Sequence, residues 1–230
     1  MNPLQPQIKQ PNLNPTHSYA TPFVVLGSHT NVGKTLVSAA LCFGFGFDYF
    51  KLIQAGFPQD KEIIASLSPK TRIFPNGITL QTPASPHIGK QLEGVEYNGL
   101  QIALPCSENL LIESAGGIYT PLDSDFCNID FVSASGLPVI LVGGYYLGGL
   151  NHILLSLKAL SVRKVKILAV VISGEYEDKM DKFLSKYYEI ENLTLAHFPL
   201  CEIKGDCIHK QSFEKSAQVL KNELCALKVF

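Results

Sequence analysis

The stretch Gly27-Ser28-His29-Thr30-Asn31-Val32-Gly33-Lys34-Thr35 decides the fold. The apolar run 23–26 before it is typical of a buried parallel strand, and the apolar run 36–41 after it can open a helix. A strand, a glycine-containing turn, Gly-Lys-Thr and a helix form a phosphate-binding loop, whose backbone N–H groups converge on phosphate oxygens. Lys34 would contact the β- and γ-phosphates, and the Thr35 hydroxyl would bind Mg²⁺.

The match to this motif is close but not strict. Five residues separate Gly27 from Gly33, where the usual pattern has four, so Ser28 stands at the expected glycine position. The alternative is a chance turn before a core helix. Because the order strand, turn and helix is also present, we favour nucleotide binding.

Length and composition indicate one large α/β domain rather than two small ones. The chain has 230 residues, of which 46% are apolar and 17% charged, with a net charge of −1. This balance gives no reason to expect nucleic acid or an acidic membrane as a partner. We expect a disordered or loosely attached leader over residues 1–20, which are polar and rich in proline, and a P-loop α/β domain over 21–230.

Cysteine usage and the lack of targeting signals predict a cytoplasmic protein. The six cysteines include no C-x-x-C pair, so neither a structural zinc site nor a disulfide framework is expected. Residues 1–20 hold no hydrophobic stretch of the secretory type, and no apolar run approaches the ~18 residues that span a bilayer.

From residue 21 onward, predicted strands alternate with predicted helices, which is typical of a parallel or mostly parallel sheet with helices on both faces. This is the P-loop NTPase-like fold class. Strands are predicted at 48–53, 77–80, 109–113, 137–142, 166–172 and 193–197. The strand 193–197 is predicted to be the last in the chain. Helices are predicted from 34 to about 44, at 61–67, after 85, and at 125–135, 151–160, 175–188 and 212–227.

Ligands of parallel α/β sheets bind at the carboxyl ends of the strands, where several polar residues are expected here. Glu113, at the end of the strand 109–113, would be the second protein ligand of Mg²⁺, or else an ordinary strand-end carboxylate. Asp60 would complete the metal shell, or else cap the following helix. Lys51 lies in an aromatic and apolar strand, so it would meet an anion or extend along the surface to an edge.

Several segments, in this order, resemble dethiobiotin synthetase over about residues 21–200. The most specific are Thr30 with Val32-Gly33-Lys34-Thr35, the Glu-x-Ala-Gly-Gly run from Glu113, Leu-Pro-Val-Ile-Leu-Val from Leu137, and Leu-Gly-x-x-Asn-His from Leu147. Lys51 to Gly56 and Ser85-Pro86-His87 also fit. Each segment is weak alone, but their joint occurrence in order is strong.

The resemblance implies an ATP-dependent ring closure of 7,8-diaminopelargonate with CO₂, in a homodimer that uses Mg²⁺. Lys34 and Lys51 match the lysines that would hold the carbamate and the transferred phosphoryl group. Thr35, Asp60 and Glu113 match the Mg²⁺ ligands. The nucleotide-binding residues would be Asn31, Val32, Gly33, Lys34, Thr35, Glu113, Gly116, Gly117 and Ser173. The substrate-binding residues would be Thr30, Lys51 and Ala55, together with Leu147 and Asn151 from the loop that reaches the substrate carboxylate in the neighbouring subunit.

The chain departs from the family pattern at four places. Asn31 stands where the family usually has Glu, and Ala55 where a hydroxyl residue commonly touches the substrate. Ser173-Gly174 replaces an Asn-Asp pair whose Asn would read the adenine edge, so ATP and CTP both remain open as the nucleotide. The interval from Thr35 to Lys51 is several residues shorter, so the first helix must be short.

Two other functions fit parts of the sequence. A nucleotide-switched, partner-binding ATPase of the chromosome-partitioning type shares the wider fold, but it usually carries an extra lysine early in the loop, where this chain has Ser28 and His29. A diverged paralogue, non-catalytic or of altered specificity, is compatible with the replacements at Asn31, Ala55 and Ser173. Among the histidines, His29 would face the substrate, whereas His87 and His152 would be structural hydrogen-bonding residues at helix starts.

Overall fold

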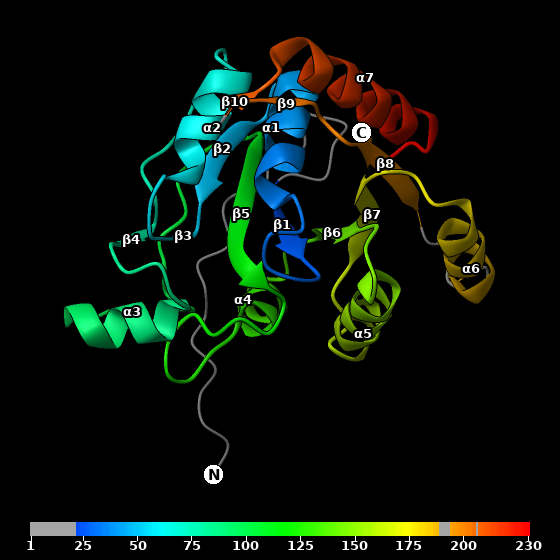
Figure 1. Cartoon of the computed structure of the whole chain (residues 1–230). Coiled ribbons are helices and arrows are strands. Elements are labelled where there is room, and N and C mark those ends of the chain that lie inside the picture. The colour runs from blue at the N-terminus through cyan, green and yellow to red at the C-terminus, as the bar shows by residue number, and fades with distance from the viewer. Residues whose placement is uncertain (1–21, 189–193, 206) are drawn as a thin grey trace.

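The computed structural model describes residues 22–188, 194–205 and 207–230, and the predicted leader 1–20 lies outside them. Its centre is a six-stranded sheet in the order β2-β5-β1-β6-β7-β8, and all of its strand pairs are parallel. The predicted fold class is therefore confirmed (Figure 1).

The strands of the main sheet are β1 Phe23–Gly27, β2 Asp48–Lys51, β5 Leu110–Gly117, β6 Val139–Gly144, β7 Ile167–Gly174 and β8 Leu195–Pro199. Two small two-stranded sheets pair β3 Ile53–Ala55 with β4 Ile78–Leu80, and β9 Ile203–Lys204 with β10 Cys207–Ile208. The helices are α1 Lys34–Phe45, α2 Asp60–Leu67, α3 Pro86–Glu93, α4 Asn128–Ser135, α5 Gly149–Val162, α6 Asp178–Tyr188 and α7 Lys210–Ala226.

Helices cover both faces of the sheet and create two separate cores. Helices α1, α2 and α7 pack on one face, where Leu41, Ile64 and Leu220 are fully buried. Helices α4, α5 and α6 contribute buried residues such as Ile129 and Leu157 to the other core. Figure 1 shows α1, α2 and α7 above the sheet and α4 and α5 below it. None of the helices in the described ranges combines the length and apolarity needed to cross a membrane.

The first helix is short, as the interval between Thr35 and Lys51 predicts. It ends at Gly46, whose φ of 75° is left-handed and whose N–H donates to the carbonyl of Cys42. Glycine adopts this conformation at little cost, so it ends the helix directly before β2. The short helix brings the β2 strand back to the sheet within a few residues.

The predicted single strand 48–53 is in fact two strands. β2 ends at Lys51 on the main sheet, and β3 pairs instead with β4, as Ile53 with Ile78. The change of partner occurs at Leu52, whose N–H still donates to Glu113 while its carbonyl accepts from Ile78. The chain therefore turns away from the main sheet directly after the lysine of interest.

The strand predicted at 109–113 was expected to end at Glu113, and this is wrong. β5 continues to Gly117 because its pairing with β1 resumes as Gly27 with Gly117 after a register irregularity. Glu113 is thus in the middle of a strand, next to Lys51 on β2.

Three further elements have boundaries that differ from the prediction. The helix predicted from 125 begins at Asn128, because the Asp123 carboxylate accepts the N–H groups of Asp125 and Phe126 and holds them in a turn. The strand predicted at 193–197 runs from Leu195 to Pro199 and is not the last, since the β9–β10 hairpin follows. The predicted helix 175–188 begins at Asp178.

Both edges of the main sheet are covered by other groups. Outside β2, Tyr49 donates its N–H to the carbonyl of Arg72 and accepts from the N–H of Phe74. Outside β8, the N–H of His197 donates to a carboxylate oxygen of Glu223 on α7, at 2.7 Å. The backbone groups that an edge strand exposes are thus bonded at these positions.

Candidate nucleotide and substrate site

The loop between β1 and α1 has the backbone of a phosphate-binding turn. Gly33, at the start of α1, has φ 95°, and Asn31 has φ 60°, so both adopt left-handed conformations. A Cβ atom on Gly33 would stand 2.8 Å from the Ser173 hydroxyl, so the loop packs closely on the end of β7. Because α1 begins directly after Gly33, its free N–H groups and positive dipole end face the loop.

Lys51, Asp60 and Glu113 form an ion-pair cluster beside this loop. Lys51 and Glu113 are register partners on β2 and β5, and the Lys51 ammonium donates to Glu113 Oε1 at 2.8 Å. The same ammonium donates to the carbonyl of Ser114 at 3.1 Å and pairs with Asp60 Oδ2. Lys51 is 4% exposed, so the alternative that it extends to a surface edge is wrong.

Glu113 also accepts hydrogen bonds from two hydroxyl groups. Thr35 Oγ1, on α1, donates to Glu113 Oε1 at 3.0 Å, and the Tyr49 hydroxyl donates to Oε2 at 3.0 Å. Burial and the neighbouring Glu113 raise the pKa of Tyr49 well above its ordinary value, so this phenol keeps its proton. The carboxylate is completely buried, and donors from α1 and β2 hold it in place.

The two lysines of the site have opposite pKa shifts. Burial lowers the pKa of Lys51, but the carboxylates of Glu113 and Asp60 outweigh this effect and the pKa is raised. Burial and then the charge of Lys51 lower the pKa of Lys34 to about 8. Burial also opposes the charge of Asp60, but the Lys51 ammonium outweighs it and lowers the pKa of this carboxyl group. Lys51 is thus firmly cationic, whereas Lys34 is the ammonium whose charge an incoming anion would stabilise.

Asp60 is positioned by Gln54 rather than by its own helix-capping bond. It is the first residue of α2, and Gln59 occupies the N-cap position, so the N-cap alternative for Asp60 is wrong. The Gln54 side chain accepts the N–H of Asp60 at 3.0 Å and donates to the carbonyl of Gly56 at 3.0 Å. Gln54, 4% exposed, therefore fixes the start of α2 against the turn after β3.

A cavity of about 800 Å³ lies over this cluster and takes in most of the predicted site residues. Among its lining residues are Thr30, Asn31, Gly33, Lys34, Thr35, Lys51, Ala55, Asp60, Glu113 and Gly116. Three predicted nucleotide-binding residues lie elsewhere. Val32 is buried, Gly117 lies close to the carbonyl of Ser28, and the Ser173 side chain lies close to Gly33 of the loop. One cavity thus combines two ammonium groups, two carboxylates and the phosphate-binding loop.

Leu147 and Asn151 do not line this cavity. Both are exposed: Leu147, 104% exposed, lies two residues before the start of α5, and Asn151 lies in its first turn. The start of α5 contacts the loop through His152, whose ring stacks on that of His29 with 5.1 Å between the ring centroids. His152 Nδ1 is also hydrogen-bonded to the Tyr146 hydroxyl at 2.6 Å. His87, at the start of α3, bonds the Ser85 hydroxyl at 3.1 Å.

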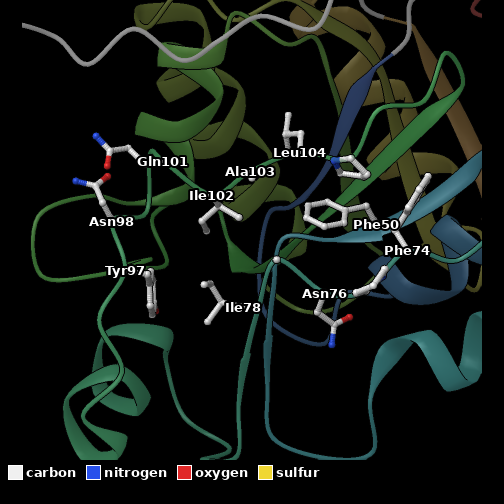
Figure 2. Close-up of a pocket in the computed structure, with 13 residues that line it drawn as sticks. Phe50, Phe74, Asn76, Ile78, Tyr97, Asn98, Gln101, Ile102, Ala103 and Leu104 are labelled. Atoms are coloured by element: carbon white, nitrogen blue, oxygen red, sulfur yellow. The ribbon is translucent and has the colours of Figure 1, made fainter.

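Two other cavities have a different character. One of about 510 Å³ lies on the opposite face of β2, lined by Phe50, Phe74, Ile78 and Tyr97 with Asn76, Asn98 and Gln101 at its rim (Figure 2). None of its lining residues in the described part of the chain is charged. The other, of about 450 Å³, lies at the ends of β7 and β8 and is lined by Tyr145, Gly174, Tyr176, His197 and Glu223, among others. Of these three cavities, the 800 Å³ cavity is the one whose described lining combines ammonium groups with carboxylates.

The donor set of the charged cluster fits a Mg²⁺ ion. Thr35, Asp60 and Glu113 present hydroxyl and carboxylate oxygens, which are the hard ligands that Mg²⁺ prefers. A small number of protein ligands is usual where phosphate oxygens and water molecules complete the coordination of Mg²⁺. The Lys51 ammonium among these oxygens also indicates a site built to hold positive charge.

Three residues of the site were not found by sequence reasoning. Period-two alternation places Tyr49 on the same strand face as Lys51, but it does not show which group of a neighbouring strand the phenol contacts. Gln54 and Thr120, whose hydroxyl accepts the N–H of Gly117 at 2.8 Å, carry no local signal, because their partners come from distant segments or tight turns.

The loop, the parallel sheet and the charged cluster at its carboxyl edge define a P-loop nucleotide-binding protein. The family model described as AAA domain matches residues 21–202. The ATP-dependent dethiobiotin synthetase BioD of Campylobacter jejuni is 49% identical over 197 residues, which cover 86% of this chain and 96% of that protein. The chain belongs to the dethiobiotin synthetase family, and the resemblance predicted from its motifs is confirmed.

Other relatives and a solved structure agree with this assignment. The proteins of the same name from Lawsonia intracellularis and Brucella ovis are 39% and 36% identical, and the matches cover 77% and 74% of this chain and 87% and 82% of those proteins. The MinC:MinD cell division protein complex of Aquifex aeolicus matches 90% of this chain and 95% of its own with a TM-score of 0.50 and 12% identity. This last likeness supports the fold alone.

Proposed function

We propose that this chain is an ATP-dependent dethiobiotin synthetase. It would join CO₂ to 7,8-diaminopelargonate and close the ureido ring, converting ATP to ADP and phosphate. The observation that carries the proposal is the convergence of Lys34, Lys51 and Glu113 on one cavity beside the phosphate-binding loop, in a chain of this family.

The reaction needs charge neutralisation and positioning rather than a covalent catalyst. One amine of the substrate takes up CO₂ as a carbamate, and a carbamate oxygen attacks the γ-phosphorus of ATP, releasing ADP. The second amine then attacks the carbonyl carbon of the mixed anhydride and expels phosphate. Lys34 would hold the β- and γ-phosphates, and Lys51 would bind the carbamate and the phosphoryl group in transfer.

Thr35, Asp60 and Glu113 would hold Mg²⁺. When bound, this ion neutralises the charge on the phosphate oxygens. Tyr49 and Gln54 would serve the same site indirectly, since they hold Glu113 and Asp60 in place.

The nucleotide would lie along the loop, with its phosphates on the backbone of residues 31–35 and near Gly116 and Gly117. Its base would lie beyond Ser173, towards the 450 Å³ cavity, where the ring of Tyr176 offers a stacking surface. ATP is the proposed co-substrate, and CTP is the alternative to be tested.

The diamine would lie between Thr30 and Ala55, and its carboxylate would meet Leu147 and Asn151 of a second subunit. The proposed protein is accordingly a homodimer, and its proposed location is the cytoplasm. Leu147 is completely exposed, does not line the cavity and follows Tyr146, whose ring lies near that of His29 in the loop, which supports a contribution to a neighbouring copy.

The test is phosphate release by the purified chain with Mg²⁺ and ATP, with and without 7,8-diaminopelargonate and bicarbonate, repeated with CTP. We expect release that requires both the diamine and bicarbonate, with dethiobiotin detected by mass spectrometry. Release that ignores the diamine would instead favour a partner-switching ATPase. No release with either nucleotide would favour a non-catalytic paralogue.

A further inference from the structure

The Lys51 ammonium occupies the space among the three proposed metal ligands. It pairs with Asp60 Oδ2 and lies 2.8 Å from Glu113 Oε1. Glu113 Oε1 also accepts the Thr35 hydroxyl at 3.0 Å, so both lone pairs of that oxygen are used. The oxygens that would bind a divalent cation are therefore already bonded to a cation that belongs to the protein.

We propose that Lys51 is a tethered counter-cation that competes with the divalent metal for Asp60 and Glu113, and that it yields these carboxylates only when the terminal phosphate of a nucleotide is there to receive it. This inference rests on the proposed function, because it uses the metal ligands assigned there. It adds that the protein itself prevents metal from binding before the nucleotide.

The charges of the cavity support this competition. Among the described residues, the charged ones that line it are Lys34, Lys51, Asp60 and Glu113, so the two ammonium groups balance the two carboxylates. A divalent cation alone would leave an excess of two positive charges in a buried site, which is strongly unfavourable. A triphosphate brings the negative charge that lets both lysines and the metal stay together.

Geometry makes the exchange of partners a short movement. A metal about 2.1 Å from Glu113 Oε1 would lie within roughly 5 Å of the present ammonium position and repel it. Lys51 and Lys34 line the same cavity, and Thr35, next to Lys34 on α1, donates to the same Glu113 oxygen as Lys51. Lys51 therefore reaches a phosphate bound at Lys34 by rotating its side chain rather than by a change of backbone.

The experiment measures Mn²⁺ binding to the purified chain without nucleotide, by electron paramagnetic resonance of the free ion. Wild type, Lys51→Met and Lys51→Gln are compared, with Lys34→Met as the matched control that removes a positive charge from the same cavity. The Gln side chain can still donate a hydrogen bond to Glu113, so Lys51→Gln allows the measurement even if Lys51→Met does not fold. We expect Mn²⁺ affinity to increase at least about tenfold in both Lys51 variants and clearly less in Lys34→Met.

A second measurement follows the melting temperature with added Mn²⁺. We expect Mn²⁺ to stabilise the Lys51 variants and to leave wild type unchanged, since only the variants have free carboxylates. Tight Mn²⁺ binding to wild type, or equal gains in the Lys34 and Lys51 variants, would overturn the proposal. Neither measurement uses the diamine or turnover, so failure of ring closure would reject the proposed function and leave this result standing.

Discussion

At the scale of single residues, Glu113 holds the site together. Its side chain accepts bonds from Thr35, Tyr49 and Lys51, which come from one helix and one strand. Its charge lies in a completely buried position, where every lost donor leaves an uncompensated polar group. Changes to its partners should therefore affect both stability and metal binding.

Replacing Tyr49 with Phe should lower both the stability of the protein and its affinity for a divalent metal. The change leaves Glu113 Oε2 without the phenol donor, so we expect unfolding free energy to fall by about 1–3 kcal/mol and divalent-metal affinity with nucleotide to fall as well. Urea unfolding and Mn²⁺ titration measure the two effects. Tyr119→Phe, at a 59% exposed position, is the control and should change neither.

Lys34 should make ATP binding proton-linked in alkaline solution. Burial and Lys51 lower its pKa to about 8, so above that pH the free protein has largely lost the proton that bound phosphate would restore. We expect ATP binding to take up protons at pH 8.5 and almost none at pH 6.5. Calorimetry in buffers of different ionisation enthalpy measures this uptake.

The Lys34→Met variant provides the control for that experiment. It lacks the titrating group, so its proton uptake at pH 8.5 should disappear along with most of its ATP affinity. Equal proton uptake at pH 6.5 and 8.5 in wild type would show that Lys34 keeps its proton at both pH values. Burial would then not lower the pKa of Lys34 as expected.

At the scale of elements, the β1–α1 turn is the part of the site that the sequence predicts best. Gly27 to Thr35 is a local pattern, and its strand and helix follow it directly in the chain, so periodicity and motif identify the same structure. Tyr49 and Gln54 were missed because their roles arise only when β2 pairs with β5 and β3 turns toward α2. Local sequence does not encode such pairings.

Errors in the predicted elements have the same origin. The small residues after Glu113 predict a strand end there, whereas the tertiary pairing of Gly117 with Gly27 extends β5. The apolar side chains of Leu52 and Ile53 predict one continuous strand over 48–53, yet the two residues pair with different partners. The β9–β10 hairpin was missed because strands of two residues have no measurable period.

Replacing Gly33 with Ala should damage nucleotide binding through the backbone. Its φ of 95° costs an L-residue roughly 1–2 kcal/mol, and the new methyl group would meet the Ser173 hydroxyl at 2.8 Å. We expect ATP affinity to fall at least about tenfold, measured by calorimetry.

Gly46→Ala is the matched control for the cost of placing alanine at a left-handed φ. Gly46 also has a left-handed φ of 75°, but no described residue other than its chain neighbours comes within 4 Å of the new methyl group, and Gly46 caps the end of α1 away from the loop. It should lower the melting temperature similarly and leave ATP affinity unchanged. A comparable loss of affinity in both variants would assign the effect to the stability of α1 rather than to the loop.

At the scale of the whole molecule, the sequence predicts the architecture well, because alternating apolar strands and helices need only the general rules of parallel sheets. Assembly is a different matter. Leu147 and Asn151 are exposed beside the His29–His152 stack, which defines a face but not its occupant.

A second copy on that face leads to a prediction for Leu147→Asp. If the proposed homodimer buries this side chain, a charge there should weaken dimerisation at least about thirtyfold and raise the KM for the diamine more than for ATP. Sedimentation velocity and steady-state kinetics measure these effects. Ile203→Asp, at a 71% exposed position on β9, is the control and should leave both unchanged.

The covered edges of the sheet limit how two copies can meet. The segment after Arg72 lies along β2, and the Glu223 carboxylate accepts the His197 backbone N–H on β8, so the outward backbone groups of Tyr49 and His197 are already bonded. Within the described residues these bonds disfavour a continuous sheet through two copies of the chain, and likewise fibril growth by strand addition. Contacts of the proposed homodimer are therefore expected in helices and loops, where a neighbour's side chains can approach a ligand.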